Sequence, residues 1–196
     1  MAPALRRNLA SAAVGATVTG DGVNLARIVD ETEATNWASL TGVADKQVTV
    51  DLAGDAPAMV SSVNVSAMLR PAIVGDADPG AQNRFTALRS FAILACNAAV
   101  ADCSQDASYA QVFVSPTDAF PAGAFRPTAP QLILRSFAIP ATLATHLRLR
   151  VLTSQCTGNP LYAGEQDADP SAATDCATAS PLAPVVRIAE FQAFAS

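Results

Sequence analysis

The segment His146-Leu147-Arg148-Leu149-Arg150-Val151 alternates strictly between polar and apolar residues, and this pattern decides the fold class. A two-residue period places alternate side chains on opposite faces of a β-strand, so one face is buried and the other meets water. The same alternation occurs in Gln47-Val48-Thr49-Val50-Asp51-Leu52 and in Ser62-Val63-Asn64-Val65-Ser66. The sequence therefore predicts several strands that each bury one face.

Three further segments are rich in Phe, Leu, Ile and Val, and we predict strands there as well: residues 85–95, 109–115 and 131–139. Long segments between the strands hold most of the 13 prolines and 10 glycines, and we interpret these segments as loops, residues 15–24 among them. Short strands without intervening amphipathic helices predict an all-β fold, an antiparallel β-sandwich or jelly roll.

Length and charge limit the domain organisation and the partners. A chain of 196 residues fits one domain, which we place at residues 8–196 after a linker remnant at residues 1–7. The net charge is −5 and the arginines are scattered, so we expect no nucleic-acid partner. The longest apolar stretch, residues 91–101, is too short to cross a bilayer, and no transmembrane segment is predicted.

The four cysteines form two pairs that are close in sequence. Cys96 and Cys103 are followed, after a long gap, by Cys156 and Cys176, and each pair brackets a loop. An even number of cysteines that flank loops favours two local disulfides and an oxidising compartment. We therefore expect a secreted, extracellular protein. A zinc site has little support, because no C-x-x-C motif occurs and His146 is the only histidine.

The chain lacks the usual catalytic motifs. It contains no H-E-x-x-H, no G-x-S-x-G and no phosphate-binding loop. We interpret His146 as a surface residue on the polar face of its strand, and the loop acids Glu165, Asp167 and Asp169 as solvated. The prediction is that this chain is not an enzyme.

Two segments at opposite ends of the chain suggest where the ends meet. Glu190 falls on the inward face of the last predicted strand, where an unpaired carboxylate is costly. The loop from Asp30 to Thr35 supplies carboxylate and hydroxyl oxygens, the donors that calcium prefers and that sodium also accepts. The alternative is a capping loop around Asp30 with Glu190 paired to an arginine. Trp37, the only tryptophan, is expected in the core.

Six segments in order give the chain its likeness to a known family. They are Asn8-Leu9-Ala10, Asp30 followed by Ala34-Thr35-Asn36-Trp37, Val48-Thr49-Val50-Asp51-Leu52, Val63-Asn64-Val65, His146-Leu147-Arg148-Leu149-Arg150-Val151 and Arg187-Ile188-Ala189-Glu190-Phe191. Over residues 8–194 the chain resembles the coagulation factor 5/8 type C, or discoidin, domain of the galactose-binding-like superfamily. The resemblance implies an eight-stranded jelly roll whose termini lie close together.

The resemblance also implies a structural calcium or sodium ion near the junction of the termini. Its ligands would come from six residues: the backbone carbonyls of Arg27 and Ala189, the side chains or carbonyls of Asp30, Thr32 and Thr35, and the carboxylate of Glu190. The chain departs from the family at Glu31, where a glycine often follows the first aspartate.

The whole chain further resembles the C-terminal accessory domain of secreted fungalysin-type metallopeptidases, whose zinc residues would lie upstream. The resemblance implies a non-catalytic binding domain of a larger secreted hydrolase, targeting it to carbohydrate or to a cell-surface glycan. The alternative is a structural domain that packs on the upstream protease domain and stabilises it. As weak candidates for ligand contact the long loops offer Arg70, Asn83 and Tyr162.

Overall fold

The computed structural model describes residues 6–78, 84–121, 133–160, 176 and 184–195. Its strands are β1 (Thr17–Gly20), β2 (Trp37–Ser39), β3 (Gln47–Asp51), β4 (Ala58–Ser66), β5 (Leu88–Cys96), β6 (Ala110–Val114), β7 (Leu134–Ala144), β8 (His146–Ser154), β9 (Val186–Ile188) and β10 (Glu190–Ala195). Its helical elements are short: η1 (Ala12–Val14), η2 (Leu25–Ile28), η3 (Arg84–Thr86), η4 (Asp106–Ser108) and α1 (Gln155–Gly158).

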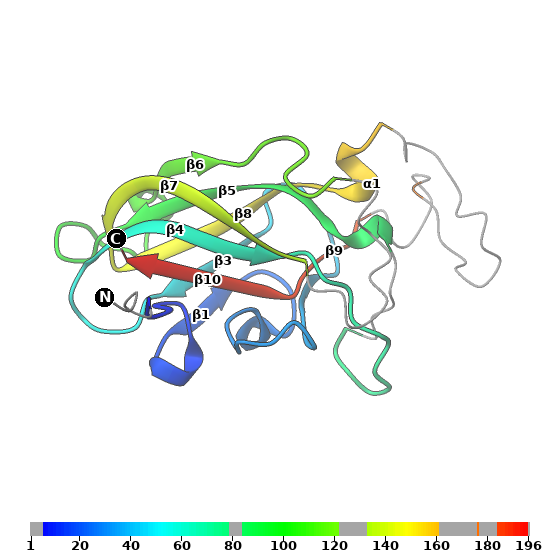
Figure 1. The fold of residues 1–196 in the computed structure, drawn as a ribbon, viewed down its shortest axis with the longest axis horizontal. Coiled ribbons are helices and arrows are strands. Elements are labelled where there is room, and N and C mark those ends of the chain that lie inside the picture. Colours follow the sequence, from blue (N-terminus) through cyan, green and yellow to red (C-terminus); the bar gives the residue numbers. More distant parts are fainter. Residues whose placement is uncertain (1–5, 79–83, 122–132, 161–175, 177–183, 196) are drawn as a thin grey trace, which may run out of the picture.

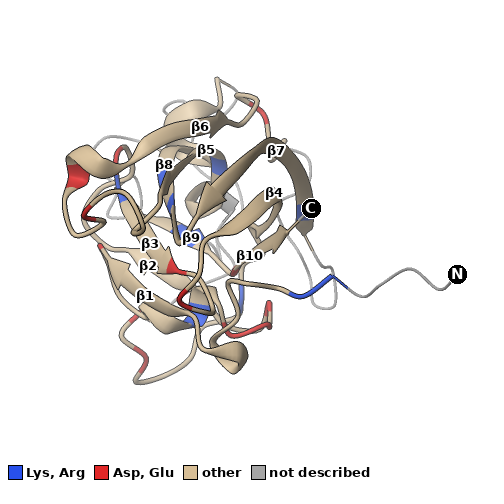
Figure 2. Ribbon diagram, turned by 90° about the vertical axis from the view of Figure 1, so that its left-hand side faces the viewer, with Lys and Arg blue, Asp and Glu red and all other residues tan. Residues whose placement is uncertain are grey.

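The strands form a two-layer sandwich. One layer is a five-stranded sheet in the order β1-β3-β8-β5-β6, and the other is a three-stranded sheet in the order β10-β4-β7. Every named strand pair is antiparallel, and a small two-stranded sheet, β2-β9, accompanies the two layers. Figure 1 shows the ribbon, and Figure 2 shows the two layers from the end. The all-β prediction of an eight-stranded antiparallel sandwich is confirmed.

The core lies between the layers and follows the alternation in the sequence. Leu147, Leu149 and Val151 of β8 point inward and are at most 1% exposed. They face the buried valines of β4, and each fully buried side chain of this size contributes roughly 1.5–3 kcal/mol. At one end of the core four phenylalanines pack with ring centroids 5.0 to 6.5 Å apart: Phe91, Phe113, Phe120 and Phe137.

The two ends of the domain meet beside β10. The backbone N–H of Leu9 donates to the carbonyl of Ala193 at 2.8 Å, and the amide N–H of Ala193 donates to Oδ1 of Asn8 at 3.0 Å. The N- and C-terminal ends accordingly lie on the same side of the sandwich (Figure 1). The predicted proximity of the termini is confirmed.

Trp37 lies in the core as predicted. Its side chain is fully buried, and its indole N–H donates to the backbone carbonyl of Asp21 at 2.7 Å. The chain passes the indole closely at Gly22, where φ is +82° and a Cβ atom would lie 2.8 Å from the indole nitrogen and 2.3 Å from the carbonyl oxygen of Ala38. A residue with a side chain would therefore displace either the indole or β2.

Both predicted disulfides, Cys96–Cys103 and Cys156–Cys176, are present. The loop prediction for residues 15–24 is wrong in part, because Thr17 to Gly20 form β1 and pair with β3 along their whole length. Within the residues that the structure describes, no helix has the length and apolar character needed to cross a membrane.

A buried ionic cluster fixes the segment after β4 to the rest of the domain. The guanidinium of Arg187 in β9 donates to both carboxylate oxygens of Asp78 at 2.8 Å, and Asn36 donates to the same carboxylate at 2.8 Å. The guanidinium of Arg70 bonds to the backbone carbonyl of Asp78 at 2.8 Å and lies 3.2 Å from the carboxylate of Asp76. Asp78 and Arg70 are 0% and 2% exposed, so this cluster is sealed from water.

Candidate functional site

A polar groove runs over the outer face of the five-stranded sheet. The inward residues of β1, β3 and β8 are apolar, so their alternating partners point outward and form the floor of the groove. The strand register places these partners in two cross-strand rows. The first row is Thr17, Asp51 and His146, and the second is Thr19, Thr49 and Arg148. The groove has a volume of about 720 Å³.

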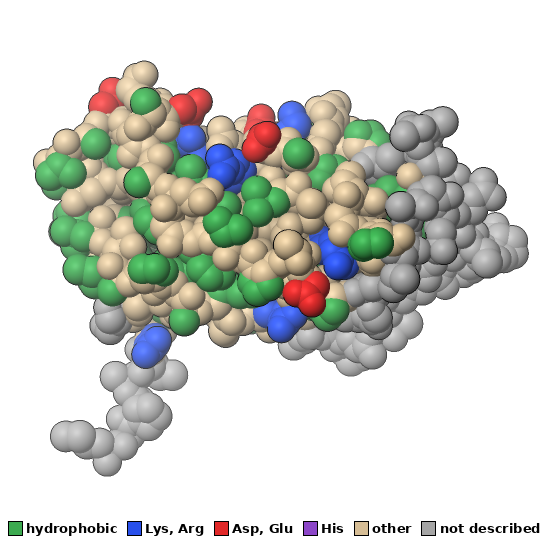
Figure 3. Space-filling model, turned by 90° about the horizontal axis from the view of Figure 1, so that it is seen from above, with side chains coloured by type: hydrophobic (Ala, Val, Ile, Leu, Met, Phe, Trp, Pro, Cys, Tyr) green, Lys and Arg blue, Asp and Glu red, His purple; other side chains and the backbone are tan. Residues whose placement is uncertain are grey.

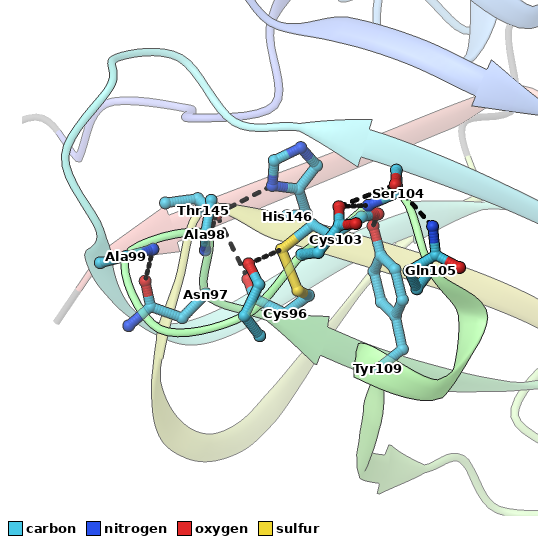
Figure 4. The surroundings of a disulfide bond; sticks show 12 residues. Cys96, Asn97, Ala98, Ala99, Cys103, Ser104, Gln105, Tyr109, Thr145 and His146 are labelled. Carbon is cyan, nitrogen blue, oxygen red and sulfur yellow. Dashed lines mark hydrogen bonds between the residues drawn. A yellow bond between two sulfur atoms is a disulfide. The ribbon is translucent and has the colours of Figure 1, made fainter.

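The loop between β5 and β6 forms one wall of the groove. Beneath it the buried side chains of Leu94, Cys96 and Tyr109 make a second, smaller apolar cluster on the outside of the sheet. The Cys96–Cys103 disulfide ties the loop to the end of β5, beside His146 (Figure 4). This wall is therefore held by a covalent link and by its own packing.

Arg148 is the charged centre of the floor. Its Nε donates to Oγ1 of Thr49 at 2.8 Å, and its Nη1 pairs with Oδ1 of Asp106 at 2.8 Å. Its guanidinium carbon lies 3.7 Å from the centre of the Tyr109 ring, a cation–π geometry. The Tyr109 hydroxyl donates to the carbonyl of Cys103 at 3.0 Å. Because Arg148 covers the ring, Tyr109 does not offer that face to a ligand.

His146 lies between two hollows. Its Nδ1 is 2.8 Å from Oγ1 of Thr145 and its Nε2 is 3.5 Å from a carboxylate oxygen of Asp51. Asp51, Ala98 and His146 line both the main groove and a second hollow of about 260 Å³, which continues toward Gly54. The sequence analysis interpreted His146 as a surface residue on a polar face. It does lie on that face, but the disulfide loop makes the face concave.

The ionisation of two groove residues is shifted by their surroundings. Hydrogen bonds from the Ser104 hydroxyl, at 2.7 Å, and from the Ser104 backbone N–H, at 3.0 Å, lower the pKa of Asp102. Burial raises the pKa of the Tyr109 hydroxyl. Asp102 is therefore a firmly ionised carboxylate at the rim, and Tyr109 is neutral.

Of the three residues proposed for ligand contact, the structure describes only Arg70. Arg70 is buried and its guanidinium belongs to the ionic cluster around Asp78. Asn83 and Tyr162 lie outside the described residues. The groove could not be predicted from the sequence, because its floor depends on strand register and on β1, a segment that was predicted to be a loop. Only the polar face of the segment from His146 to Val151 signalled it.

Three of the predicted cation residues, Arg27, Asp30 and Thr35, contact one another in η2 and the loop that follows it. Oδ2 of Asp30 accepts a hydrogen bond from Oγ1 of Thr35 at 2.7 Å, and the same hydroxyl lies 3.5 Å from the backbone carbonyl of Arg27. The hydroxyl of Thr32 instead accepts the backbone N–H of Ala34 at 3.1 Å. The loop thus presents a carboxylate, a hydroxyl and a carbonyl at close spacing.

Glu190 approaches this loop from β10 as a buried, unpaired carboxyl group. The residue is 1% exposed and neither carboxylate oxygen makes a hydrogen bond of normal geometry. Burial, and next the nearby carboxylate of Asp30, raise the pKa of Glu190 to about 9. No described arginine pairs with it, and Arg187, three residues before it, is bound to Asp78. Glu31, which replaces the family's glycine, keeps a left-handed conformation with φ of +64°.

The donor set at this point suits a hard cation. Among residues 6–78, 84–121, 133–160, 176 and 184–195, no three His, Cys, Asp or Glu side chains gather into a metal-binding group. Asp30 and Glu190 would therefore supply the only two carboxylates, with the other donors coming from neutral oxygens such as the Arg27 carbonyl and the Thr35 hydroxyl. Calcium accepts such mixed oxygen ligation. Ala189, the sixth predicted ligand, lies in the backbone just before Glu190 and is fully buried.

The fold is similar to those of several solved carbohydrate-binding modules. A family 32 module of Clostridium perfringens, in complex with GalNAc-β-1,3-galactose, is 14% identical, with a TM-score of 0.53 over 96% of this chain and 100% of that one. The family 32 module of AlyQ, in complex with 4,5-unsaturated mannuronic acid, is 15% identical, with a TM-score of 0.53 over 98% and 99%. Chitosan-binding module 1 of a Paenibacillus chitosanase/glucanase is 16% identical, with a TM-score of 0.52 over 96% and 98%.

No protein-family model matches the sequence of this chain, and no curated protein matches it. The structural likeness therefore concerns the fold alone: this chain has a β-sandwich similar to those of these modules.

Proposed function

We propose that this domain is a non-catalytic carbohydrate-binding module and that its ligand lies in the groove above Thr49 and Arg148. The observation that carries the proposal is an open polar groove on a fold shared with sugar-bound modules. Sugars present hydroxyl groups that both donate and accept hydrogen bonds. The threonine hydroxyls, the Asp51 carboxylate and the Arg148 guanidinium supply the complementary partners.

The rigidity of the groove supports binding. Its floor is made by paired strands and its wall is tied by the Cys96–Cys103 disulfide, so little conformational entropy is lost when a ligand binds. Asp102 is poorly suited to act as a general acid, because that role needs a carboxyl group with a raised pKa and the pKa of Asp102 is lowered.

The domain is proposed to act as an accessory part of a larger secreted hydrolase. One structural neighbour carries a family 32 module together with an alginate lyase domain, and this chain matches 33% of it. The two disulfides support an extracellular location. A metallopeptidase parent rests on the resemblance to fungalysin accessory domains, and the target would be a polysaccharide or a cell-surface glycan.

A calcium ion is proposed to bind where the chain ends meet, in a structural role. The support is the buried, unpaired carboxyl group of Glu190 facing the loop of Asp30 and Thr35. The ion would neutralise two neighbouring carboxylates and lock the loop to β10. Sodium would take the same oxygens less tightly.

Docking on a protease domain is the alternative function. Exposed hydrophobic residues do occur: Met59, Val114, Leu134 and Leu143 are 39% to 49% exposed. Met59 and Leu143 are cross-strand neighbours on β4 and β7, whereas Val114 lies on β6 and Leu134 at the other end of β7. Figure 3 shows the hydrophobic side chains of one face interspersed with polar atoms. A surface that docks on another domain is expected to form one continuous apolar patch.

Blocking the groove is expected to abolish carbohydrate binding. Thr19 is exposed on the edge strand β1 and lines the groove, so Thr19→Tyr would fill it without disturbing the core. On a glycan array, we expect the unmodified domain to bind and Thr19→Tyr to lose at least about tenfold in affinity, the cost of roughly 1.4 kcal/mol of lost contacts. The matched control is Thr117→Tyr, at an exposed threonine that lines neither hollow. Equal binding by Thr19→Tyr, or no binding by the unmodified domain, would contradict the proposal.

A further inference from the structure

The residues that line the groove carry more negative than positive charges. Across the main groove and the second hollow the lining carboxylates are Asp51, Asp55 and Asp102. The only lining arginine, Arg148, is already paired with Asp106 at 2.8 Å. His146 adds a positive charge only when it is protonated. The groove therefore presents a net negative surface to whatever enters it.

The carboxylates are spaced along the groove and are open to solvent. Asp51 stands at the junction of the two hollows with its side chain 53% exposed. Asp102 lies on the disulfide wall, and Asp55 lies beyond Gly54 in the second hollow; both are exposed. The hydrogen bonds from Ser104 keep Asp102 ionised. A ligand with one positive charge would meet one of these groups, whereas a chain of regularly spaced charges would meet several.

The groove lacks an aromatic platform, which affects the choice of ligand. Sugars without charge gain much of their affinity by stacking on an exposed aromatic face. Among the described lining residues the one Phe, Tyr or Trp is Tyr109, and Arg148 lies over its ring. Affinity in this groove must come from hydrogen bonds and charge. The two contiguous hollows, about 720 and 260 Å³, exceed what one sugar unit needs.

From an acidic, elongated groove whose described aromatic ring is covered by Arg148, we propose that the ligand is an oligomer of amino sugars with free, protonated amino groups. This inference rests on the proposed carbohydrate-binding function and narrows it to one class. Successive ammonium groups pair with the lining carboxylates while the sugar hydroxyls bond to the threonines of β1 and β3. The opposite charge pattern, a chain of uronic acids, is repelled.

The test measures binding by calorimetry with four probes of equal length at a pH where amines are protonated. They are a glucosamine hexamer, an N-acetylglucosamine hexamer, a mannuronate hexamer and a lysine hexamer. We expect the glucosamine hexamer to bind at least about tenfold more tightly than each of the others, and its affinity to fall severalfold from about 50 mM to about 200 mM salt. The double variant D51N/D102N should lose about tenfold, and D118N, an exposed aspartate outside both hollows, less than about twofold.

The outcomes separate the two proposals. Equal or tighter binding of the acetylated or uronate hexamer, with loss in Thr19→Tyr, would overturn the amino-sugar inference and leave the carbohydrate site standing. Equal binding of the lysine hexamer would show that the groove selects charge and not sugar, which overturns the inference as well. Binding of none of the saccharides would overturn both proposals.

Discussion

Replacing Asp78 by alanine is expected to destabilise the domain by about 3–5 kcal/mol, because the change leaves the buried guanidinium of Arg187 without its carboxylate partner. Asp78 is 0% exposed and Arg187 is 5% exposed, so water cannot replace the lost hydrogen bonds. The side-chain amide of Asn36 would lose one of its two acceptors at the same time and keep the carbonyl of Trp37. The cluster joins β9 to the segment after β4, and its loss should loosen that whole side of the sandwich.

Chemical denaturation followed by circular dichroism measures this effect. The control is Asp118→Ala, which removes an exposed carboxylate and should change the free energy of unfolding by less than about 0.5 kcal/mol. Asp78→Asn retains part of the hydrogen bonding, so it should fall between the two. A loss below about 1 kcal/mol for Asp78→Ala would mean that the cluster does not stabilise the fold as described.

Acid should weaken the same region. Hydrogen bonds from Asn24 and next from Arg27 hold the pKa of Asp76 well below its usual range. A carboxyl group whose pKa is lower in the folded state stabilises the protein above its unfolded pKa, and this contribution is lost as the pH falls toward the folded value. The ionic cluster is therefore expected to contribute fully at neutral pH and to fail only in strong acid.

Calcium is expected to raise the free energy of unfolding by about 2.7 kcal/mol at a concentration one hundred times its Kd, and EDTA should reverse the effect. The reason is that the ion binds the folded arrangement of Asp30, Thr35 and Glu190 and not the unfolded chain. Differential scanning calorimetry, with calcium or EDTA present, measures the shift in Tm.

The variant Glu190→Gln distinguishes the contribution of calcium binding to stability from the contribution of side-chain packing. Without a cation, burial raises the pKa of Glu190 to about 9, so the folded protein holds this group protonated and neutral at pH 7. A glutamine of the same shape should therefore be tolerated in EDTA, yet it should remove the calcium response. Asp118→Asn is the control and should keep that response. A calcium shift that survives in Glu190→Gln, or no shift in the unmodified domain, would contradict the proposed ion.

The sequence predicted the parts of the fold that depend on local pattern. The alternation from His146 to Val151 predicted a strand with one buried face, and the position of Glu190 predicted an inward carboxylate at the chain junction. Both follow from the two-residue period. The spacing of the cysteines similarly predicted Cys96–Cys103 and Cys156–Cys176. These features require no knowledge of which strands are neighbours.

The features that the sequence could not supply are those that depend on register. Thr17 and Thr19 lie in a segment with a glycine at each end, and only pairing with β3 makes them a strand beside Asp51. Arg70 was assigned to a variable loop, but its guanidinium is held in the interior by Asp76 and Asp78. No pattern in the sequence indicated these contacts. The concave groove likewise arises when the loop of Cys103 folds back over β5.

The position of the ligand on the folded domain tests the central claim most directly. The measurement is a titration of the ¹⁵N-labelled domain with the tightest-binding saccharide, followed by backbone amide chemical shifts. We expect the largest changes at Thr17, Thr19, Ala98, Asp102 and His146, along both hollows of the groove. Changes that instead cluster elsewhere, with these amides unmoved at saturation, would contradict the assignment of the groove as the carbohydrate site.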